Sequence, residues 1–195
     1  MKVQATTDDI PETGPSGLHL PKTVLSTALD RIIEFFGELA SWLWTLLMLL
    51  IVYQVVQRYA FGKGSIMLEE MQWHLYAVGF LLGMAVTEIR ERHVRIDVLA
   101  EMMPQRVRLW IEMIGIAGLL LTFVAVMLWF AWPFVLSSYE LHEVSAAPDG
   151  LPYRWALKSF IITAFVLLGL AGLSRLSRVL AALRLKAGGS SHAAL

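Results

Sequence analysis

The chain has 195 residues, with 16 Lys and Arg against 16 Asp and Glu, so its formal net charge is zero. Apolar residues other than glycine make up 57% of it and charged residues 16%, whereas soluble domains average about 45–50% apolar with glycine included and about 25% charged. The balanced charge excludes the class of nucleic-acid-binding proteins, which carry a basic surface. The absence of cysteine excludes disulfides, thiolate metal sites and thiol nucleophiles.

Residues 1–20 are rich in Thr, Asp, Pro and Gly, which predicts a disordered N-terminus. A cleaved signal peptide is not expected, because no short apolar core with a small-residue cleavage site follows. Residues 22–38 are amphipathic at helical spacing, with apolar side chains on one face and polar side chains on the other. We expect this segment to lie in the cytoplasmic interface of a membrane, with packing on a protein partner as the alternative.

Four long apolar segments follow, at residues 39–59, 73–89, 110–135 and 160–173. Each approaches or exceeds the ~20 residues that cross a bilayer, and aromatic residues lie near their ends. Almost no ionisable side chain lies deep inside them, although membrane enzymes, pumps and channels usually carry such charges. The sequence therefore predicts an all-α integral membrane four-helix bundle, formed by one domain at residues 21–186 and followed by a flexible tail at 187–195.

The distribution of Lys and Arg predicts the orientation of this bundle. Most of these residues lie before the first segment, between the second and third, and after the fourth. Cytoplasmic loops hold the excess of Lys and Arg in membrane proteins. Both termini are therefore expected in the cytoplasm.

Polar residues near the ends of the first two segments are candidate contacts. Gln54, Gln57 and Arg58 should face protein or the interface rather than lipid. Glu69 and Glu70 precede the second segment, where a structural tie or a partner contact is favoured over ion binding. These residues give the first two helices a protein-facing side but no chemistry of their own.

Small residues mark positions where helices can approach closely. Gly79 and Gly83 form a small-xxx-small pair that Thr87 extends, and this pattern favours helix packing in lipid. Packing within the bundle and packing against a partner remain equally open. Other expected close-approach points are Gly115, Gly118, Gly169 and Gly172.

The connection between the second and third segments is basic and amphipathic, so its apolar side chains can face the membrane while its arginines meet headgroups. Pro104 suits the first turn of the next helix. His93 and Asp97, like Glu88 and Arg92, are four residues apart and can pair on a helix face. A proton relay at His93 and Asp97 is the lesser alternative.

Five histidines raise the possibility of haem or metal ligation. His74 is the only histidine inside an apolar segment, near its end, where it can hydrogen-bond Glu70. His93 lies on the opposite side of the membrane and His142 in an outer loop. Because bis-histidine ligation needs two facing helices at one depth, this arrangement argues against haem.

The order of several short motifs resembles the small permease (DctQ-like) subunit of tripartite ATP-independent periplasmic (TRAP) transporters. The resemblance covers about residues 25–180. A Glu near the start of the second span is matched by Glu69 or Glu70, and both choices stay open. The remaining motif positions are Arg92, His93, Asp97 and Pro104 after the second span, and Glu143, Ser145, Pro152, Trp155 and Lys158 in the outer loop.

This resemblance implies a non-catalytic subunit, without a cofactor of its own, in the bacterial inner membrane. Its expected partners are the lipid bilayer, a large membrane subunit that carries substrate and coupling sodium ions, and a periplasmic substrate-binding protein. The imported substrate would be an organic acid of unspecified kind. Glu143, Asp149 and Arg154 would lie where the binding protein docks.

Two other classes of protein compete with this interpretation. A membrane anchor subunit of a respiratory or other redox enzyme would be expected to hold a cofactor, most simply haem through His74. An independent membrane enzyme would need a polar cluster at one depth, and the segments contain none.

Overall fold

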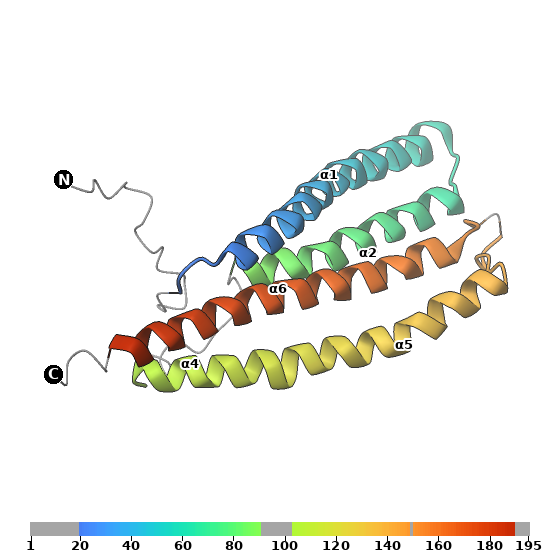
Figure 1. Ribbon diagram of the computed structural model, residues 1–195. Helices are drawn as coiled ribbons and strands as arrows, with labels where there is room; N and C mark the ends of the chain where they lie inside the picture. The colour runs from blue at the N-terminus through green and yellow to red at the C-terminus, as the bar shows by residue number, and fades with distance from the viewer. Residues whose placement is uncertain (1–19, 91–102, 149, 190–195) are drawn as a thin grey trace.

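The computed structural model describes residues 20–90, 103–148 and 150–189. These residues form α1 (Val24–Phe61), α2 (Ile66–Ile89), α4 (Gln105–Ile114), the π-helical segment η2 (Gly115–Leu120), α5 (Leu121–Glu140) and α6 (Arg154–Gly189). Because α4, η2 and α5 continue into one another, the described residues form four long helical rods (Figure 1). The predicted all-α fold is confirmed.

Local sequence signals set the ends of the first two helices. The Thr23 hydroxyl accepts from the Ser26 N–H at 3.1 Å while the Ser26 hydroxyl accepts from the Thr23 N–H at 3.0 Å, which forms a capping box. Gly62 ends α1 with a φ of 62°, in the left-handed region that glycine enters at little cost. The short connection to the Ser65 cap of α2 then makes the two helices antiparallel neighbours.

One narrow stripe of α1 is buried, and its members recur every seven residues, the spacing of a coiled-coil seam. This stripe faces α2 and α6, which both contact α1. The rest of α1 is exposed and strongly apolar: Trp42 is 73% exposed and Tyr59 83%. The buried stripe consists of Ser26, Ile33, Ala40, Leu47 and Gln54.

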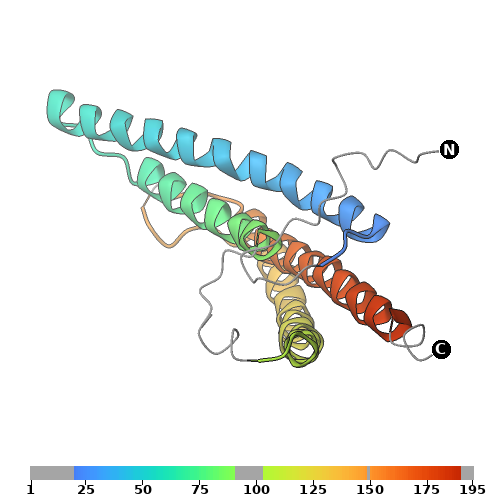
Figure 2. The same cartoon turned by 90° about the vertical axis from the view of Figure 1, so that its left-hand side faces the viewer.

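Helix α6 is the centre of the arrangement, because it contacts α1, α2, α4 and α5. In the most apolar 18-residue stretch of α6, 33% of the residues are buried inside the bundle. The corresponding stretches of α1 and of the α4–α5 rod are each 11% buried. Figures 1 and 2 show α1 and α5 on opposite sides of α6. The bundle is therefore open, and it leaves long apolar faces on α1 and α5 uncovered.

Glycines permit close approach on α6 but not on the α4–α5 rod. A Cβ at Gly169 would lie 3.2 Å from Val124, and one at Gly172 would lie 3.0 Å from Leu120. At Gly115 and Gly118, both in η2, a Cβ would meet nothing within 4 Å. Close approach within the chain is thus seen at Gly169 and Gly172 but not at Gly115 and Gly118.

The predicted boundary between an interfacial helix at residues 22–38 and a first span falls inside α1, which runs through it unbroken. At about 1.5 Å per residue α1 is about 57 Å long, more than the ~40–45 Å of a bilayer with its headgroups. Its first turns pack on the C-terminal part of α6, and Ser26 from the expected outer face is fully buried there. These first turns of α1 therefore pack on another helix of the same chain.

In the part of the chain that the structure describes, three helical rods are long and apolar enough to cross a membrane: α1, Gln105–Glu140 and Arg154–Leu185. Helix α2, the second of the four predicted spans, falls short in composition because polar residues lie at both its ends. Its 24 residues nevertheless extend about 36 Å, enough to cross ~30 Å of hydrocarbon.

The predicted end regions fall mostly outside the described residues, which exclude 1–19 and 190–195. Residues 187–189, assigned to a flexible tail, form the end of α6 instead. Leu20, assigned to the disordered N-terminus, packs against the apolar core around Leu109 and Val179.

Candidate functional site

The connection between α5 and α6 is tied to the first turns of α2 by Glu70. Its Oε1 accepts a hydrogen bond from Ser145 Oγ, and its Oε2 accepts one from the Leu151 N–H at 2.6 Å. The same two loop residues also pair directly, because the Ser145 N–H donates to the Leu151 carbonyl at 3.2 Å. Gly150 suits this neck, since a Cβ there would lie 2.5 Å from Ser145 Cβ. One carboxylate from α2 thus holds both sides of the loop neck.

A second carboxylate, Glu143, fixes the stem of the loop to α5 and α6. It accepts hydrogen bonds from Lys158 Nζ and from Ser138 Oγ, the latter at 2.7 Å, and Arg154 lies 3.9 Å away. The Arg154 N–H also donates to the Glu143 carbonyl at 3.2 Å. Lys158 lies over the Phe134 ring, 4.1 Å from its centroid, a favourable cation–π geometry. We call Glu70, Glu143, Ser145, Leu151 and Lys158 the loop-end cluster.

Glu70 precedes the second predicted span and Glu143 follows the third, so both carboxylates lie outside the apolar segments. Both are stabilised in the charged form. The Ser145 hydrogen bond, followed by that from the Leu151 N–H, lowers the pKa of Glu70 below its ordinary value of 4.5. The Lys158 hydrogen bond, followed by that from a serine, lowers the pKa of Glu143 in the same way. The cluster is therefore held by ionised glutamates at neutral pH.

Gln54 is buried between α1 and α2, as predicted for a protein-facing residue. Its Nε2 donates to Glu69 Oε1 at 3.0 Å, and its Oε1 accepts from Gln72 Nε2. Gln57 bonds within α1, to a tyrosine hydroxyl at 2.8 Å, while Arg58 is exposed. The adjacent glutamates of α2 therefore have different partners: Glu69 contacts α1 and Glu70 contacts the α5–α6 loop.

The outer side of the α5–α6 loop carries an apolar groove of about 430 Å³. Two aromatic rings on it, Tyr139 and Trp155, pack edge to face with their centroids 5.4 Å apart. His142 and Tyr153 both have positive φ angles, 48° and 63°, which the surrounding hydrogen bonds must hold. The groove is lined by Tyr139, His142, Val144, Pro152, Tyr153 and Trp155.

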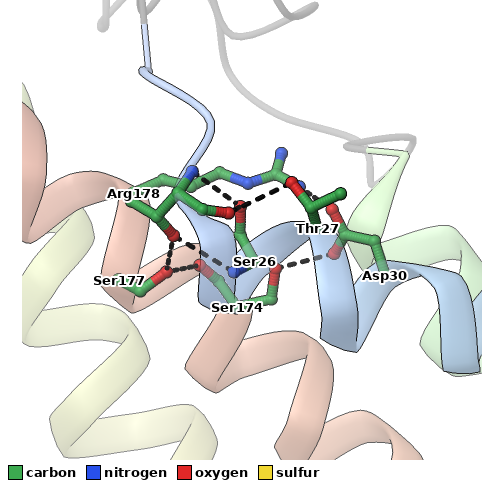
Figure 3. Close-up of polar contacts among 7 residues, drawn as sticks. Ser26, Thr27, Asp30, Ser174, Ser177 and Arg178 are labelled. Atoms are coloured by element: carbon green, nitrogen blue, oxygen red, sulfur yellow. Dashed lines mark hydrogen bonds and ion pairs between the residues drawn. The ribbon is translucent and has the colours of Figure 1, made fainter.

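At the other end of the bundle, near the start of α1 and the end of α6, an ion pair joins these two helices (Figure 3). Arg178 donates to Asp30, whose other oxygen accepts from Ser174 Oγ at 2.6 Å. The hydroxyls of Thr23 and Ser177 lie 2.9 Å apart beside it. Both charged side chains of the pair are more than four-fifths buried.

Arg175 joins three helices at the same end. Its guanidinium donates to Glu112 of α4 and lies 4.0 Å from Glu88 of α2. The Arg175 side chain is only 6% exposed, so removing it would leave carboxylates in a desolvated position, which typically costs about 3–5 kcal/mol. We call these residues and the Asp30–Arg178 pair the terminus-end cluster.

The two clusters lie one membrane thickness apart. Glu70 and Glu88 are separated by about 27 Å along α2, and Lys158 and Arg175 by about 26 Å along α6, close to the ~30 Å of a bilayer core. Between these positions neither helix carries Asp, Glu, Lys or Arg. The charged groups therefore form two layers that enclose an apolar slab.

The small residues predicted on α2 have separate environments. A Cβ at Gly79 would lie 3.2 Å from Trp44, so this glycine serves packing within the chain. A Cβ at Gly83 would meet nothing within 4 Å, and Gly83 lines an open groove of about 220 Å³ between α1 and α2. Thr87 Oγ1 donates to the Gly83 carbonyl at 2.9 Å. Only the first glycine is thus committed to packing within the bundle.

The structure places the other candidate residues as follows. Pro104 immediately precedes α4 as its N-cap, one position before the expected first turn. His74 Nδ1 pairs with the Glu70 carbonyl at 2.6 Å rather than with its carboxylate. Among the residues described, no group of three or more His, Asp or Glu side chains could hold a metal ion. The candidates Arg92, His93, Asp97 and Asp149 lie outside the described residues.

Sequence reasoning missed the terminus-end cluster, including Asp30, Glu112 and Arg178. The signal was present in the run Ser-Arg-Leu-Ser-Arg at residues 174–178, which places hydroxyl and guanidinium groups on one side of a helix beyond the last apolar segment. The partner Asp30 lies more than 140 residues earlier, on the polar side of residues 22–38, so spacing along the chain does not reveal the pairing.

Comparison with known families decides which class of membrane protein carries these two clusters. Residues 47–182, well over half of the chain, match the family described as tripartite ATP-independent periplasmic transporters, DctQ component. The chain belongs to this DctQ family. No curated protein and no solved structure matched it. The protein is thus a TRAP transporter small subunit, and the matched region contains both glutamates of the loop-end cluster.

Proposed function

We propose that this DctQ subunit is a non-catalytic scaffold for the large TRAP membrane subunit. The observation that carries the proposal is the separation of its polar and apolar groups. The charged residues of both clusters find their partners inside the chain, whereas the faces of α1 and α5 expose large apolar side chains such as Trp42 and Trp129. Such faces suit packing in the bilayer, either against lipid or against helices of another subunit.

A scaffold must resist deformation while its partner moves. Here the terminus-end cluster joins α1, α2, α4 and α6, and the loop-end cluster joins α2 to α5 and α6. Helices tied at both ends move as one unit more readily than helices held by apolar contacts alone. The large subunit would then carry out transport against this fixed support, with substrate and coupling sodium ions bound in the large subunit.

The second part of the proposal is that the loop end helps to dock the periplasmic substrate-binding protein during uptake of an organic acid across the bacterial inner membrane. With both termini in the cytoplasm, the α5–α6 loop faces the periplasm, because it lies at the opposite end of the rods (Figure 1). Arg154 is 41% exposed there beside Glu143, and Asp149 belongs to the same loop. These charges suit contact with a soluble protein.

Co-purification tests the scaffold function. The tagged small subunit is expressed together with the large subunit, the membrane is extracted in mild detergent, and uptake is measured in cells with and without the small subunit. We expect the large subunit to elute with the tag and uptake to be lost without the small subunit. A small subunit that elutes alone and is dispensable for uptake would refute the proposal.

A further inference from the structure

The neck of the α5–α6 loop is closed by a side chain that does not belong to it. Backbone pairing between Ser145 and Leu151 brings the two sides together, and the Glu70 carboxylate bonds to the same two residues from α2. Ser145 Oγ also accepts from the Ala147 N–H at 3.3 Å, and the Gly150 N–H donates to the Ala147 carbonyl at 3.1 Å. Apart from the Gly150–Ala147 bond, each of these hydrogen bonds involves Glu70 or one of the two residues that Glu70 holds.

We infer that Glu70 is a positioning residue that fixes the shape of the α5–α6 loop for docking of the substrate-binding protein. The inference rests on the docking function proposed above and adds which residue controls it. Glu70 would act through the loop, because its own oxygens are turned toward Ser145 and Leu151 and are not presented outward.

The neighbouring Glu69 cannot serve the same role, because it is exposed and bonds to Gln54 of α1. The two glutamates have the same charge, the same helix and nearly the same depth, yet only one reaches the loop. Glu69 is therefore a matched control for Glu70. Replacing either by alanine removes one negative charge from the same turn of α2, so a difference between the variants reports the loop contact.

The side of the loop that Glu70 fixes is rich in aromatic and apolar surface. Val144 is 62% exposed and Tyr153 69% exposed, and both line the 430 Å³ groove on either side of the neck. Their relative positions depend on the neck, since it joins the stretch before residue 145 to the stretch after residue 151. Breaking the contacts of the neck should therefore separate Val144 from Tyr153 without disturbing the helices of the bundle.

The first measurement follows the loop itself. The chain has no cysteine, so Ala146→Cys introduces a single attachment site for a nitroxide spin label at an exposed loop position. We expect Glu70→Ala to increase the mobility of this label in the purified complex with the large subunit, and Glu69→Ala to leave it unchanged. A label equally immobile in both variants would overturn the inference.

The second measurement follows docking. The complex in lipid nanodiscs is titrated with the substrate-binding protein encoded beside the transporter. We expect Glu70→Ala to lower its affinity about tenfold at an unchanged yield of complex. Ser145→Ala should have a similar effect, and the double variant should add little, because both substitutions break one contact. Glu69→Ala should stay within about twofold of wild type.

The two measurements separate the inference from the function on which it rests. A mobile loop with unchanged affinity would overturn the positioning role while leaving docking intact. Equal losses of affinity in Glu69→Ala and Glu70→Ala would show that the removed charge, and not the loop contact, is responsible. That result would also overturn the positioning role. Absence of any binding to the wild-type complex would refute the docking function itself, and the inference about docking with it.

Discussion

Glu143 is an ionised side chain whose partners come from two different helices. Lys158 of α6 and then Ser138 of α5 lower the pKa of the Glu143 carboxyl below 4.5, and the loop neck lowers the pKa of Glu70 likewise. Both groups therefore bind protons more weakly in the folded chain than in the unfolded chain. Their contribution to stability is complete above pH 4.5 and is lost as the pH falls through the lowered values.

Because both pKa values are lowered in the folded chain, the purified subunit should lose stability in acid. We expect its thermal midpoint, followed by circular dichroism in detergent, to fall once the pH drops below about 4.5. Glu143→Gln should have a lower midpoint at neutral pH and a shallower decline in acid, because one titrating group is gone. Glu140→Gln, at an exposed position three residues earlier, should keep the wild-type profile. Identical profiles for Glu143→Gln and wild type would contradict the assignment.

The order of motif residues led to the correct loop but not to its contacts. Glu143, Ser145 and Lys158 were grouped by resemblance, and the structure brings them to one end of the bundle. What could not be predicted is that Ser145 bonds to a helix 75 residues earlier in the chain. The choice between Glu69 and Glu70 depends on which way each side chain points, and helical periodicity alone does not say what lies opposite.

At the scale of helices, the long apolar segments located each rod, but they did not show that α1 begins as early as Val24. Asp30 resembled part of a solvated face, because nothing near it in sequence supplies its partners. Its partners, Ser174 and Arg178, lie in α6, more than 140 residues away. The seven-residue recurrence from Ser26 to Gln54 crosses the expected boundary without a break and is the sequence signal of the continuous helix.

The approach of α1 to α2 gives a prediction at the same scale. A Cβ at Gly37 would lie 2.6 Å from Val86 Cγ2, whereas one at Gly83 would meet nothing within 4 Å. Replacing glycine by alanine favours the helix equally at both positions, by up to about 1 kcal/mol. We expect Gly37→Ala to be less stable than Gly83→Ala by about 1–3 kcal/mol, the usual cost of overpacking.

Comparison of thermal midpoints for the two glycine variants measures this difference. Val86→Ala, combined with Gly37→Ala, should recover most of the loss by removing the overlapping methyl group. Equal stability of the two single variants would show that α2 shifts freely relative to α1.

For the whole molecule, the orientation of the rods is the prediction with the widest consequence. The start of α1 and the end of α6 lie at the same end (Figure 1), as an even number of crossings requires. The excess of Lys and Arg around this end predicts that it lies in the cytoplasm. A fluorescent protein fused after Leu195 should therefore fluoresce, and an alkaline phosphatase fused there should be inactive. Active phosphatase would reverse the assignment and remove the loop end from the periplasm.

The spacing of the two charged layers has a consequence for the lipid around the protein. A helix in too thick a bilayer usually tilts or lets its flanking charges snorkel. Glu70 and Glu88 have little freedom to do so, because the first is bound to a loop neck and the second lies beside buried Arg175. Hydrophobic mismatch would then be relieved by the membrane, which must thin to meet α2. By this means the small subunit would set the bilayer thickness in which its partner works.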